Sequence, residues 1–310
     1  MVLTVTLNPS IDRTLFVDRI KTCDTNRVKL SQTDAGGKGI NVARVLAALG
    51  TKVTATGFLG GRNGHLVRGV LTEEGVDCDF VRVDEETRVN ISIEEDAQHC
   101  PPTTFNEPGP NINDEEWERL VHRVKSAAGH FQWITFGGSL PPGVPKDAYS
   151  QLVDIAQKEG AKAVLDADAE VLSLALNQHP YMIKPNVKEA ERLLQKELPD
   201  EAACMSAAKE LNNKGIPLVV LSRGAEGAII VCDGVAYRAI PPKIEAKSTI
   251  GSGDSMIAGI LYSLIQNCSI DEALRWGTAS GAATALTSGA DICTRQQVED
   301  LLSFVKVERL

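Results

Sequence analysis

Hydrophobic and polar positions along the chain follow two alternating periods, one typical of strands and one typical of helices. Residues 2–7 (VLTVTL) form a continuous, β-branched apolar run that predicts a buried strand, whereas INVARVLAALG (40–50) has apolar residues at helical spacing. The same succession recurs through KVTATGF, a predicted helix at 114–128, and WITFG. This strand–helix rhythm predicts an α/β fold with a mostly parallel, doubly wound sheet.

Two segments break this rhythm. Residues 14–33 and TRVNISIEE (87–95) alternate apolar and polar positions, which predicts half-exposed strands. The last third of the chain has the strand-like segments PLVVLS, GAIIVC and VAYRAI, then predicted helices at 254–266, 271–288 and 294–305. Because no linker or repeat is visible, we predict one domain over 1–310, with β excursions inserted at about 13–33 and 87–105.

Composition narrows the classes of partner. The chain has 310 residues, 43% of them hydrophobic, and a formal net charge of −9. Its lysines and arginines are scattered, so the basic stripe that nucleic-acid binding requires is missing. The sequence lacks a run of about 18 apolar residues and begins without a signal-peptide pattern, so we expect no membrane span. Seven dispersed cysteines favour reduced thiols in a cytoplasmic protein.

The segment TIGSGDSMIAG offers the sharpest chemical hypothesis. The backbone amides of Gly251, Ser252 and Gly253 could hold an anion at the start of a helix, with Asp254 close enough to accept a proton from an attacking hydroxyl. A plain turn followed by a capping aspartate explains the motif alone equally well. The dinucleotide fingerprint G-x-G-x-x-G fails at Met256, which argues against an NAD site.

Two further stretches fall at predicted strand ends, where open parallel sheets bind ligands. In IKPNVKEAERLL, Asn186 and Glu189 lie one helical turn apart and could face a metal–phosphate group beside Lys184, although a helix cap is the commoner explanation. In VVLSRGAEGAIIV, closely spaced glycines would let a nucleotide approach the backbone, although a β-turn would explain them too.

Two more glycine-rich stretches complete the set. DAGGKGINVAR opens a helix and suits a polar substrate, but Gln32 replaces the first glycine of a Walker A loop. FGGSLPPGVP fails the nucleophile-elbow pattern at Pro141, and none of the five histidines has an obvious partner role. A hydrolase is therefore a poor second hypothesis.

Together these stretches resemble the ribokinase-like (PfkB-type) sugar kinases. AGGKGINVARVLAALG is similar to the N-terminal glycine-rich signature of that family and STIGSGDSMIAGIL to its C-terminal signature. KPNVKE, LSRGAEGA and GGSLPPG are similar to the intermediate motifs, so the likeness covers essentially the whole chain. TLNPSIDRT, the NR of DTNRVKL and TRVNISI resemble the phosphosugar branch, which contains 1-phosphofructokinase, tagatose-6-phosphate kinase and the minor 6-phosphofructokinase.

The resemblance implies a Rossmann-type three-layer fold with a small β-sheet lid, and a role for each motif. Asp254 would be the general base, with Gly251, Ser252 and Gly253 as the anion hole. The implied phosphosugar contacts are Asp12, Arg27, Gly37, Lys38, Asn41, Arg88, Asn90 and Ser139. The implied ATP contacts are Lys184, Asn186, Ser222, Arg223, Gly224, Gly227, Ser248 and Thr249. Asn186 and Glu189 would hold Mg²⁺ through water.

The resemblance also implies partners: ATP and Mg²⁺, a monovalent cation such as K⁺ near 248–250 and 284–289, and a homodimer formed through the lid strands. TRVNISI and GKGINVAR favour fructose 1-phosphate as acceptor. ALRWGTASGAATALTSGADICT resembles the minor 6-phosphofructokinase instead, although Thr25 replaces its usual lysine, and tagatose 6-phosphate stays open. A non-catalytic sugar-phosphate sensor is disfavoured because Asp254 and its glycines are intact. Arg223 and DADAEVL depart from the family pattern.

Overall fold

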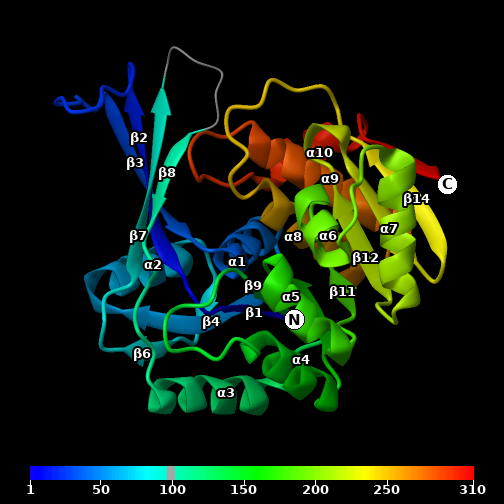
Figure 1. The fold of residues 1–310 in the computed structure, drawn as a ribbon, viewed down its shortest axis with the longest axis horizontal. Coiled ribbons are helices and arrows are strands. Elements are labelled where there is room, and N and C mark those ends of the chain that lie inside the picture. The colour runs from blue at the N-terminus through cyan, green and yellow to red at the C-terminus, as the bar shows by residue number, and fades with distance from the viewer. Residues whose placement is uncertain (96–101) are drawn as a thin grey trace.

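The computed structural model of the chain describes residues 1–95 and 102–310. They form a large eleven-stranded sheet and a separate four-stranded sheet (Figure 1). The β excursion expected at 87–105 therefore includes a segment, 96–101, that lies outside the described residues.

The large sheet is parallel at its centre and antiparallel at one edge. Its parallel strands are β1 (Val2–Thr6), β4 (Val53–Gly60), β5 (Asp77–Cys78), β6 (Val81–Val83), β9 (Trp133–Gly137), β10 (Lys162–Asp166), β11 (Met182–Ile183) and β12 (Leu218–Ser222). The antiparallel edge consists of β13 (Ala228–Cys232), β14 (Val235–Ile240) and β15 (Lys306–Arg309). All five residues of β1 are buried, as expected for a strand covered on both faces.

Helices cover both faces of this sheet. One face packs against α3 (Asp114–Ala128), α4 (Ala148–Lys158), α5 (Ala169–Ala175), α6 (Val187–Leu194) and α7 (Glu201–Asn213). The other packs against α1 (Lys38–Ala48), α2 (Gly61–Glu73), α8 (Ser252–Ile265), α9 (Ile270–Ala285) and α10 (Arg295–Leu302). Short 3₁₀ turns occupy Leu176–Gln178 and Gly224–Glu226. The three layers confirm the predicted doubly wound α/β fold.

Two expected helix ends were placed too late. The helix expected at 271–288 ends at Ala285, and the one expected at 294–305 ends at Leu302. The residues after Leu302 lead into strand β15, which pairs with the edge strand β14 and which the sequence pattern did not indicate.

The small sheet has the order β3-β2-β7-β8, with β2 (Ser10–Val17), β3 (Leu30–Gly36), β7 (Arg88–Glu95) and β8 (Thr103–Asn106). It stands apart from the large sheet and contacts α1 and α2 (Figure 1). β2 follows directly after β1, and β3 leads directly into α1. The small sheet is thus tied to the carboxyl ends of the central strands, the edge at which open α/β sheets bind ligands.

Candidate active site

One carboxylate stands at the start of α8, where the glycine-rich loop ends. The N-cap residue Gly251 has a φ of 74°, a left-handed conformation that favours glycine, and the helix begins at Ser252. Asp254 lies in the first turn and is only 7% exposed. Because first-turn amides lack intrahelical partners and carry the positive end of the helix dipole, this loop can hold an anion beside Asp254.

Helix α1 supplies the group that orients this carboxylate. The side-chain amide Nδ2 of Asn41 donates to Asp254 Oδ2 at 2.8 Å. The Oδ1 atom of Asn41 is buried and has no hydrogen-bond partner among the described residues. Asn41 was expected to bind a sugar hydroxyl. The structure shows that it holds the Asp254 carboxylate, while its unpaired Oδ1 can still accept a hydrogen bond from a ligand hydroxyl.

A cluster of two lysines and two further carboxylates surrounds Asp254. Asp166, at the end of β10, lies between the two ammonium groups, with Oδ1 2.9 Å from Lys38 Nζ and Oδ2 3.5 Å from Lys184 Nζ. Glu189 Oε1 is 3.9 Å from Lys38 Nζ. Asp166, Lys184 and Glu189 are buried. The carboxyl ends of β10 and β11 and the starts of helices α1, α6 and α8 thus converge on one charged cluster.

Burial and neighbouring charges adjust the proton affinity of these groups. Burial, and then the negative charge of Asp166, raise the pKa of Asp254 to about 7, against the opposing effects of Lys38 and Asn41. Burial would lower the pKa of Lys38, but Asp166, Asp254 and Glu189 outweigh it and raise that pKa. Burial would raise the pKa of Asp166, yet Lys184 and Lys38 lower it. A carboxylate with a pKa near neutrality suits general-base chemistry.

Gly253 allows Lys184 to lie against the start of α8. A Cβ atom added at Gly253 would lie 3.1 Å from Lys184 Nζ, so a side chain there would press on the ammonium group. Ser252 Oγ is buried and has no partner among the described residues. Amides, an ammonium group and an unpaired hydroxyl therefore line one small region beside Asp254, as a transferring phosphoryl group requires.

Asn186 and Glu189 cap α6 reciprocally. Glu189 N donates to Asn186 Oδ1 at 2.9 Å, and Asn186 N donates to Glu189 Oε2 at 2.8 Å. The helix-cap interpretation is thus what the structure shows, but Glu189 is buried rather than solvated. Its second oxygen, Oε1, lies 3.9 Å from Lys38 Nζ.

These oxygens fit a weakly held divalent ion. Among residues 1–95 and 102–310, no group of three or more His, Cys, Asp or Glu side chains is arranged to hold a metal on its own. Asp166 Oδ2 is buried without a hydrogen bond, however, and Glu189 Oε1 is not used by the cap. Mg²⁺ commonly uses one or two protein carboxylates together with waters and substrate phosphates, which this donor set could supply.

The segments expected to contact the nucleotide lie beside Asn186. Ser222, at the end of β12, forms a parallel bridge with Asn186, and its amide donates to Pro185 O at 3.0 Å. Gly227 has a φ of 89°, and a Cβ there would lie 1.9 Å from Ala239 O, so the fold itself requires this glycine. In the loop before Gly251, Ser248 is buried and Thr249 is exposed.

Arg223 takes part in a salt-bridge network. Its guanidinium is 10% exposed and pairs with Glu201 at 2.7 Å, as well as with Glu226. Glu201 also pairs with Arg238 of β14, so Arg223 belongs to a network that joins α7 to the sheet edge. The guanidinium is thus engaged with carboxylates, and the expected contact of Arg223 with ATP stays a prediction. Gly224 beside it has a φ of 59° and open space where a side chain would be.

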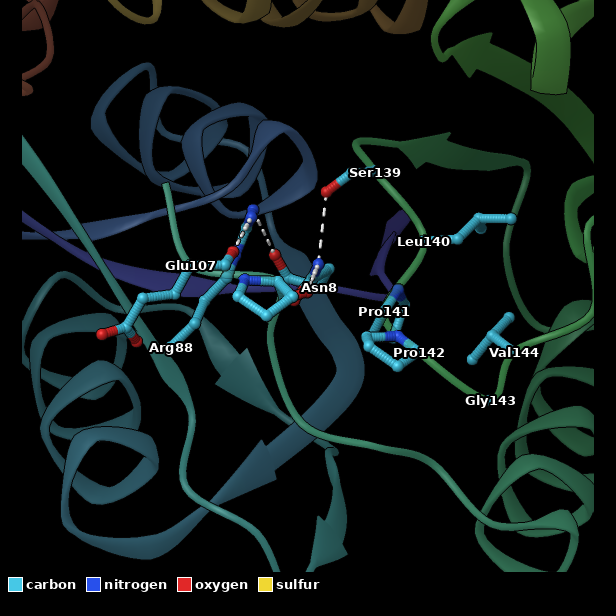
Figure 2. Close-up of a pocket in the computed structure, with 10 residues that line it drawn as sticks. Asn8, Arg88, Glu107, Ser139, Leu140, Pro141, Pro142, Gly143 and Val144 are labelled. Carbon is cyan, nitrogen blue, oxygen red and sulfur yellow. Dashed lines mark hydrogen bonds between the residues drawn. The ribbon is translucent and has the colours of Figure 1, made fainter. Parts of the chain in front are cut away.

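A separate pocket contains Arg88. Its Nη1 and Nη2 atoms donate to the backbone oxygens of Glu107 at 3.1 Å and Asn8 at 3.0 Å, and its buried Nε has no partner among the described residues. Asn8 Nδ2 donates to Ser139 Oγ at 3.3 Å, the contact drawn in Figure 2. The pocket has a volume of about 430 Å³, and Pro108 and residues 140–144 form the rest of its wall.

Lys38 and Arg27 were expected beside Arg88, around the phosphate of the sugar. The structure places Lys38 against Asp166 instead, because that buried carboxylate attracts its ammonium group, and Lys38 does not line the Arg88 pocket. Arg27 is exposed on the connection between β2 and β3, among exposed residues. Within a single chain, only Arg88 and Ser139 of the expected phosphate contacts lie together.

The expected sugar contacts Asp12 and Asn90 lie between these two regions. Asp12 Oδ1 accepts from Ser10 Oγ at 2.7 Å and from Asn90 Nδ2 at 2.9 Å. A Cβ at Gly36 would lie 2.0 Å from Asp12 Oδ2, and the next residue, Gly37, is the N-cap of α1 with φ of 117°. The glycine pair therefore gives Asp12 access to the start of α1, where Lys38 and Asn41 belong to the charged cluster around Asp254.

One residue of the charged cluster, Asp166, and one residue of the Arg88 pocket, Asn8, were not predicted as site residues. Asp166 and Asn8 belong to no glycine-rich motif, and each stands at or just after the end of a buried strand. The rule that ligands bind at the carboxyl ends of parallel strands was the available signal for both.

Comparison with known sequences decides the family. The chain matches the pfkB family carbohydrate kinase profile over residues 5–297. The chain belongs to the pfkB family of carbohydrate kinases. It is thus a phosphotransferase, and family membership implies ATP and a divalent metal as its co-substrate and cofactor.

Relatives within the pfkB family match the chain from end to end. The chain is 34% identical to a 1-phosphofructokinase of Borreliella burgdorferi, with 99% of this chain and 98% of the relative covered. It is 33% identical to the ATP-dependent 6-phosphofructokinase isozyme 2 of Escherichia coli, with 97% and 98% covered. The crystal structure of Escherichia coli phosphofructokinase-2 with substrates and products superposes with a TM-score of 0.92 at 32% identity, with 98% of each chain covered. No helix in the described part of the chain could cross a membrane.

Proposed function

We propose that this pfkB kinase transfers the γ-phosphate of ATP to the 6-hydroxyl of fructose 1-phosphate, which gives fructose 1,6-bisphosphate. The observation that carries the proposal is the buried Asp254, held by Asn41 next to the ammonium groups of Lys38 and Lys184. The 1-phosphofructokinase relative supports the choice of acceptor.

The geometry supports an acceptor that already carries a phosphate. The cationic groups of the site form two separate sets: Lys38 and Lys184 beside Asp254, and Arg88 in its own pocket with Ser139. The first set can hold the phosphoryl group in transit. The second can hold a phosphate that does not react, because an arginine fork suits phosphate oxygens and Arg88 Nε is unpaired. An unphosphorylated sugar would leave the Arg88 pocket without a ligand.

In the proposed reaction Asp254 accepts the proton of the acceptor hydroxyl through its free carboxylate oxygen. The hydroxyl oxygen then forms a bond to the γ-phosphorus while the bond from phosphorus to the bridging oxygen of ADP breaks. The amides of Gly251 to Gly253 and the Lys184 ammonium stabilise the charge on the transferring group. The products are the sugar bisphosphate, ADP and the proton held by Asp254.

Residues for the nucleotide and metal complete the proposal. Glu189 and Asn186 would hold Mg²⁺ through water, with Asp166 close by, and Ser222, Gly224, Gly227, Ser248 and Thr249 would line the ATP site. When bound, Mg²⁺ neutralises phosphate charge. A monovalent cation beside 248–250 and 284–289 stays a prediction.

The test is an ADP-release assay with Mg-ATP and a panel of acceptors. Fructose 1-phosphate is expected to give the highest kcat/KM. Fructose 6-phosphate is the second candidate, favoured by the 6-phosphofructokinase relative, and tagatose 6-phosphate is the third. A preference for an unphosphorylated sugar would contradict the role of Arg88, and no ADP release with any acceptor would favour a sugar-phosphate sensor.

Replacing Arg88 by alanine is expected to raise the KM for the sugar phosphate about 10- to 100-fold, the effect of losing charge-assisted hydrogen bonds. The KM for ATP should stay within about twofold, because the Arg88 pocket is separate from the lysine cluster. Arg62→Ala, at an exposed position of α2, is the matched control. Equal effects of Arg88→Ala on both KM values would contradict the assignment.

We also propose that residues 1–310 form one kinase domain in which the small sheet is a lid, and that two lids pair in a homodimer. Alternate residues of this sheet place apolar side chains on the face opposite to Asp12 and Asn90: Leu15, Ile91, Ile93 and Phe105. Phe105 is 59% exposed, and β3 and β8 are open sheet edges. An apolar sheet face in water favours a second copy as cover.

Phe105→Asp is therefore expected to shift the protein from dimer toward monomer in sedimentation equilibrium, because a buried carboxylate would face the partner lid. Phe304→Asp is the control, since Phe304 is 64% exposed and far along the chain, after α10. If both variants keep the assembly state of the wild type, the lid face is not the interface.

A further inference from the structure

A second cavity lies between the small sheet and the body of the protein, and it shares no lining residue with the Arg88 pocket. Its volume is about 220 Å³. The small sheet contributes Asp12, Arg13, Thr14, Asn90, Ser92, Thr104 and Asn106, and the body of the protein contributes Ile250 and Ala290. Ile250 directly precedes Gly251, so the cavity adjoins the proposed anion hole.

Strand register explains why this wall is polar. β2, β7 and β8 pair so that Asp12, Asn90 and Asn106 form one cross-strand row. Thr14, Ser92 and Thr104 form the next row on the same face. Side chains alternate between faces along each strand, so the intervening apolar residues point the other way. The sheet therefore turns its hydrogen-bonding face inward and its apolar face outward.

The two rows differ in which of their polar atoms remain available for hydrogen bonds with a ligand. The first row is tied together, since Asn90 Nδ2 donates to Asp12 and Ser10, which leaves the buried Oδ1 of Asn90 unpaired. In the second row, no hydrogen bond joins the hydroxyls of Thr14, Ser92 or Thr104 to another side chain or backbone group in the described ranges. These three hydroxyls keep both donor and acceptor capacity.

The chemistry of the wall identifies the kind of ligand. Its groups are hydroxyls, amides and one carboxylate, and its one cationic side chain, Arg13, belongs to the strand position that alternates to the outer face. Such a wall is poorly suited to phosphate but suits a chain of sugar hydroxyls, which can donate and accept at each carbon. Three hydroxyls at a fixed cross-strand spacing can also distinguish one hydroxyl configuration from another.

We propose that Thr14, Ser92 and Thr104 form a second recognition row that reads the configuration of the acceptor's hydroxyls. This row would set the preference of the enzyme among ketose phosphates. The inference rests on the proposed function for the identity of the acceptor, but it assigns the choice of sugar to residues that lie outside every glycine-rich motif.

The test compares two adjacent threonines of β8. Thr104 faces the cavity, whereas Thr103 pairs with Ile93 and points to the outer face. Thr104→Val is expected to raise the KM for fructose 1-phosphate about fivefold, the effect of one neutral hydrogen bond, and Ser92→Ala to do the same. The KM for ATP and kcat should stay within about twofold. Thr103→Val, the matched control, should leave all three values unchanged.

Configuration is the second readout. The ratio of kcat/KM for fructose 1-phosphate to that for its 4-epimer, tagatose 1-phosphate, should fall in Thr104→Val and Ser92→Ala but not in Thr103→Val. Equal losses in Thr103→Val and Thr104→Val would overturn the inference, because the effect would then be on the sheet itself. Unchanged KM values in both cavity variants would overturn it too. A wild-type enzyme that turns over no ketose phosphate would instead overturn the proposed function, and the inference with it.

Discussion

Asp254→Asn is expected to lower kcat by about 10²- to 10⁴-fold, the usual contribution of a positioned general base. The asparagine amide keeps the size of the side chain but cannot accept the proton of the acceptor hydroxyl. The anion-holding amides and both lysines remain, so binding of ATP and sugar phosphate should change little. Steady-state ADP release measures the loss in kcat, and titration calorimetry measures binding.

The matched control is Asp271→Asn, which alters an acid in the first turn of the neighbouring helix α9. Its kcat should stay within about twofold of the wild type. If Asp254→Asn worked at full speed while Asp271→Asn did too, the carboxylate would have no role in proton transfer.

The same assignment fixes the pH dependence. Burial and Asp166 raise the pKa of Asp254 to about 7, and only the deprotonated carboxylate can accept a proton. The kcat/KM of the wild type should therefore fall as the pH drops through about 7 and level off above it. A profile that stays flat between pH 5 and 8, after correction for the titration of the substrate phosphates, would contradict a base in this environment.

Much of the fold could be predicted because its elements are long and strongly periodic. The helix expected at 114–128 has those bounds in α3, where Asn113 and Glu116 form a capping box, and WITFG is β9. Strand β15 was missed, because four residues are too short for a period and its pairing with β14 depends on a contact far along the chain. The apolar run before it made the preceding helix look longer than it is.

The candidate site likewise has residues that a local motif predicts and residues that only contacts in the folded chain bring together. Asp254 and the glycines before it were predicted because the turn and the helix start that hold them require a recognisable local sequence motif. The ion pairs of Arg223 and Lys38 could not be predicted, because Glu201 is close to Arg223 only in the folded chain and Asp166 is 128 residues away from Lys38. Asp166 itself was overlooked, since a single aspartate at a strand end has no local signature. The sequence pattern therefore could not predict ion pairs between residues that are distant in the chain.

Replacing Asp166 by asparagine is expected to lower both activity and stability. Asp166→Asn removes the carboxylate that lies between the ammonium groups of Lys38 and Lys184, at 2.9 and 3.5 Å. Those two positive charges would then repel each other without compensation, and removing one partner of a buried ion pair costs about 3 kcal/mol or more. We expect kcat to fall about 10- to 100-fold, because displaced lysines no longer meet the transferring phosphoryl group. Thermal unfolding should show a lower Tm.

If Asp166 had a purely structural role, its replacement would lower stability and activity without moving the pH profile. The pH profile therefore distinguishes a structural role from an electrostatic effect on Asp254. The negative charge of Asp166 raises the pKa of Asp254, whereas Lys38 and Lys184 lower it. In Asp166→Asn burial still raises the pKa of Asp254, but the only charges that act on it are those of Lys38 and Lys184, which lower it. The acid limb of kcat/KM should therefore move to lower pH. Asp168→Asn, which changes the exposed N-cap of α5, should leave limb and Tm in place. An acid limb that stays near pH 7 in Asp166→Asn would show that Asp166 does not act on the base.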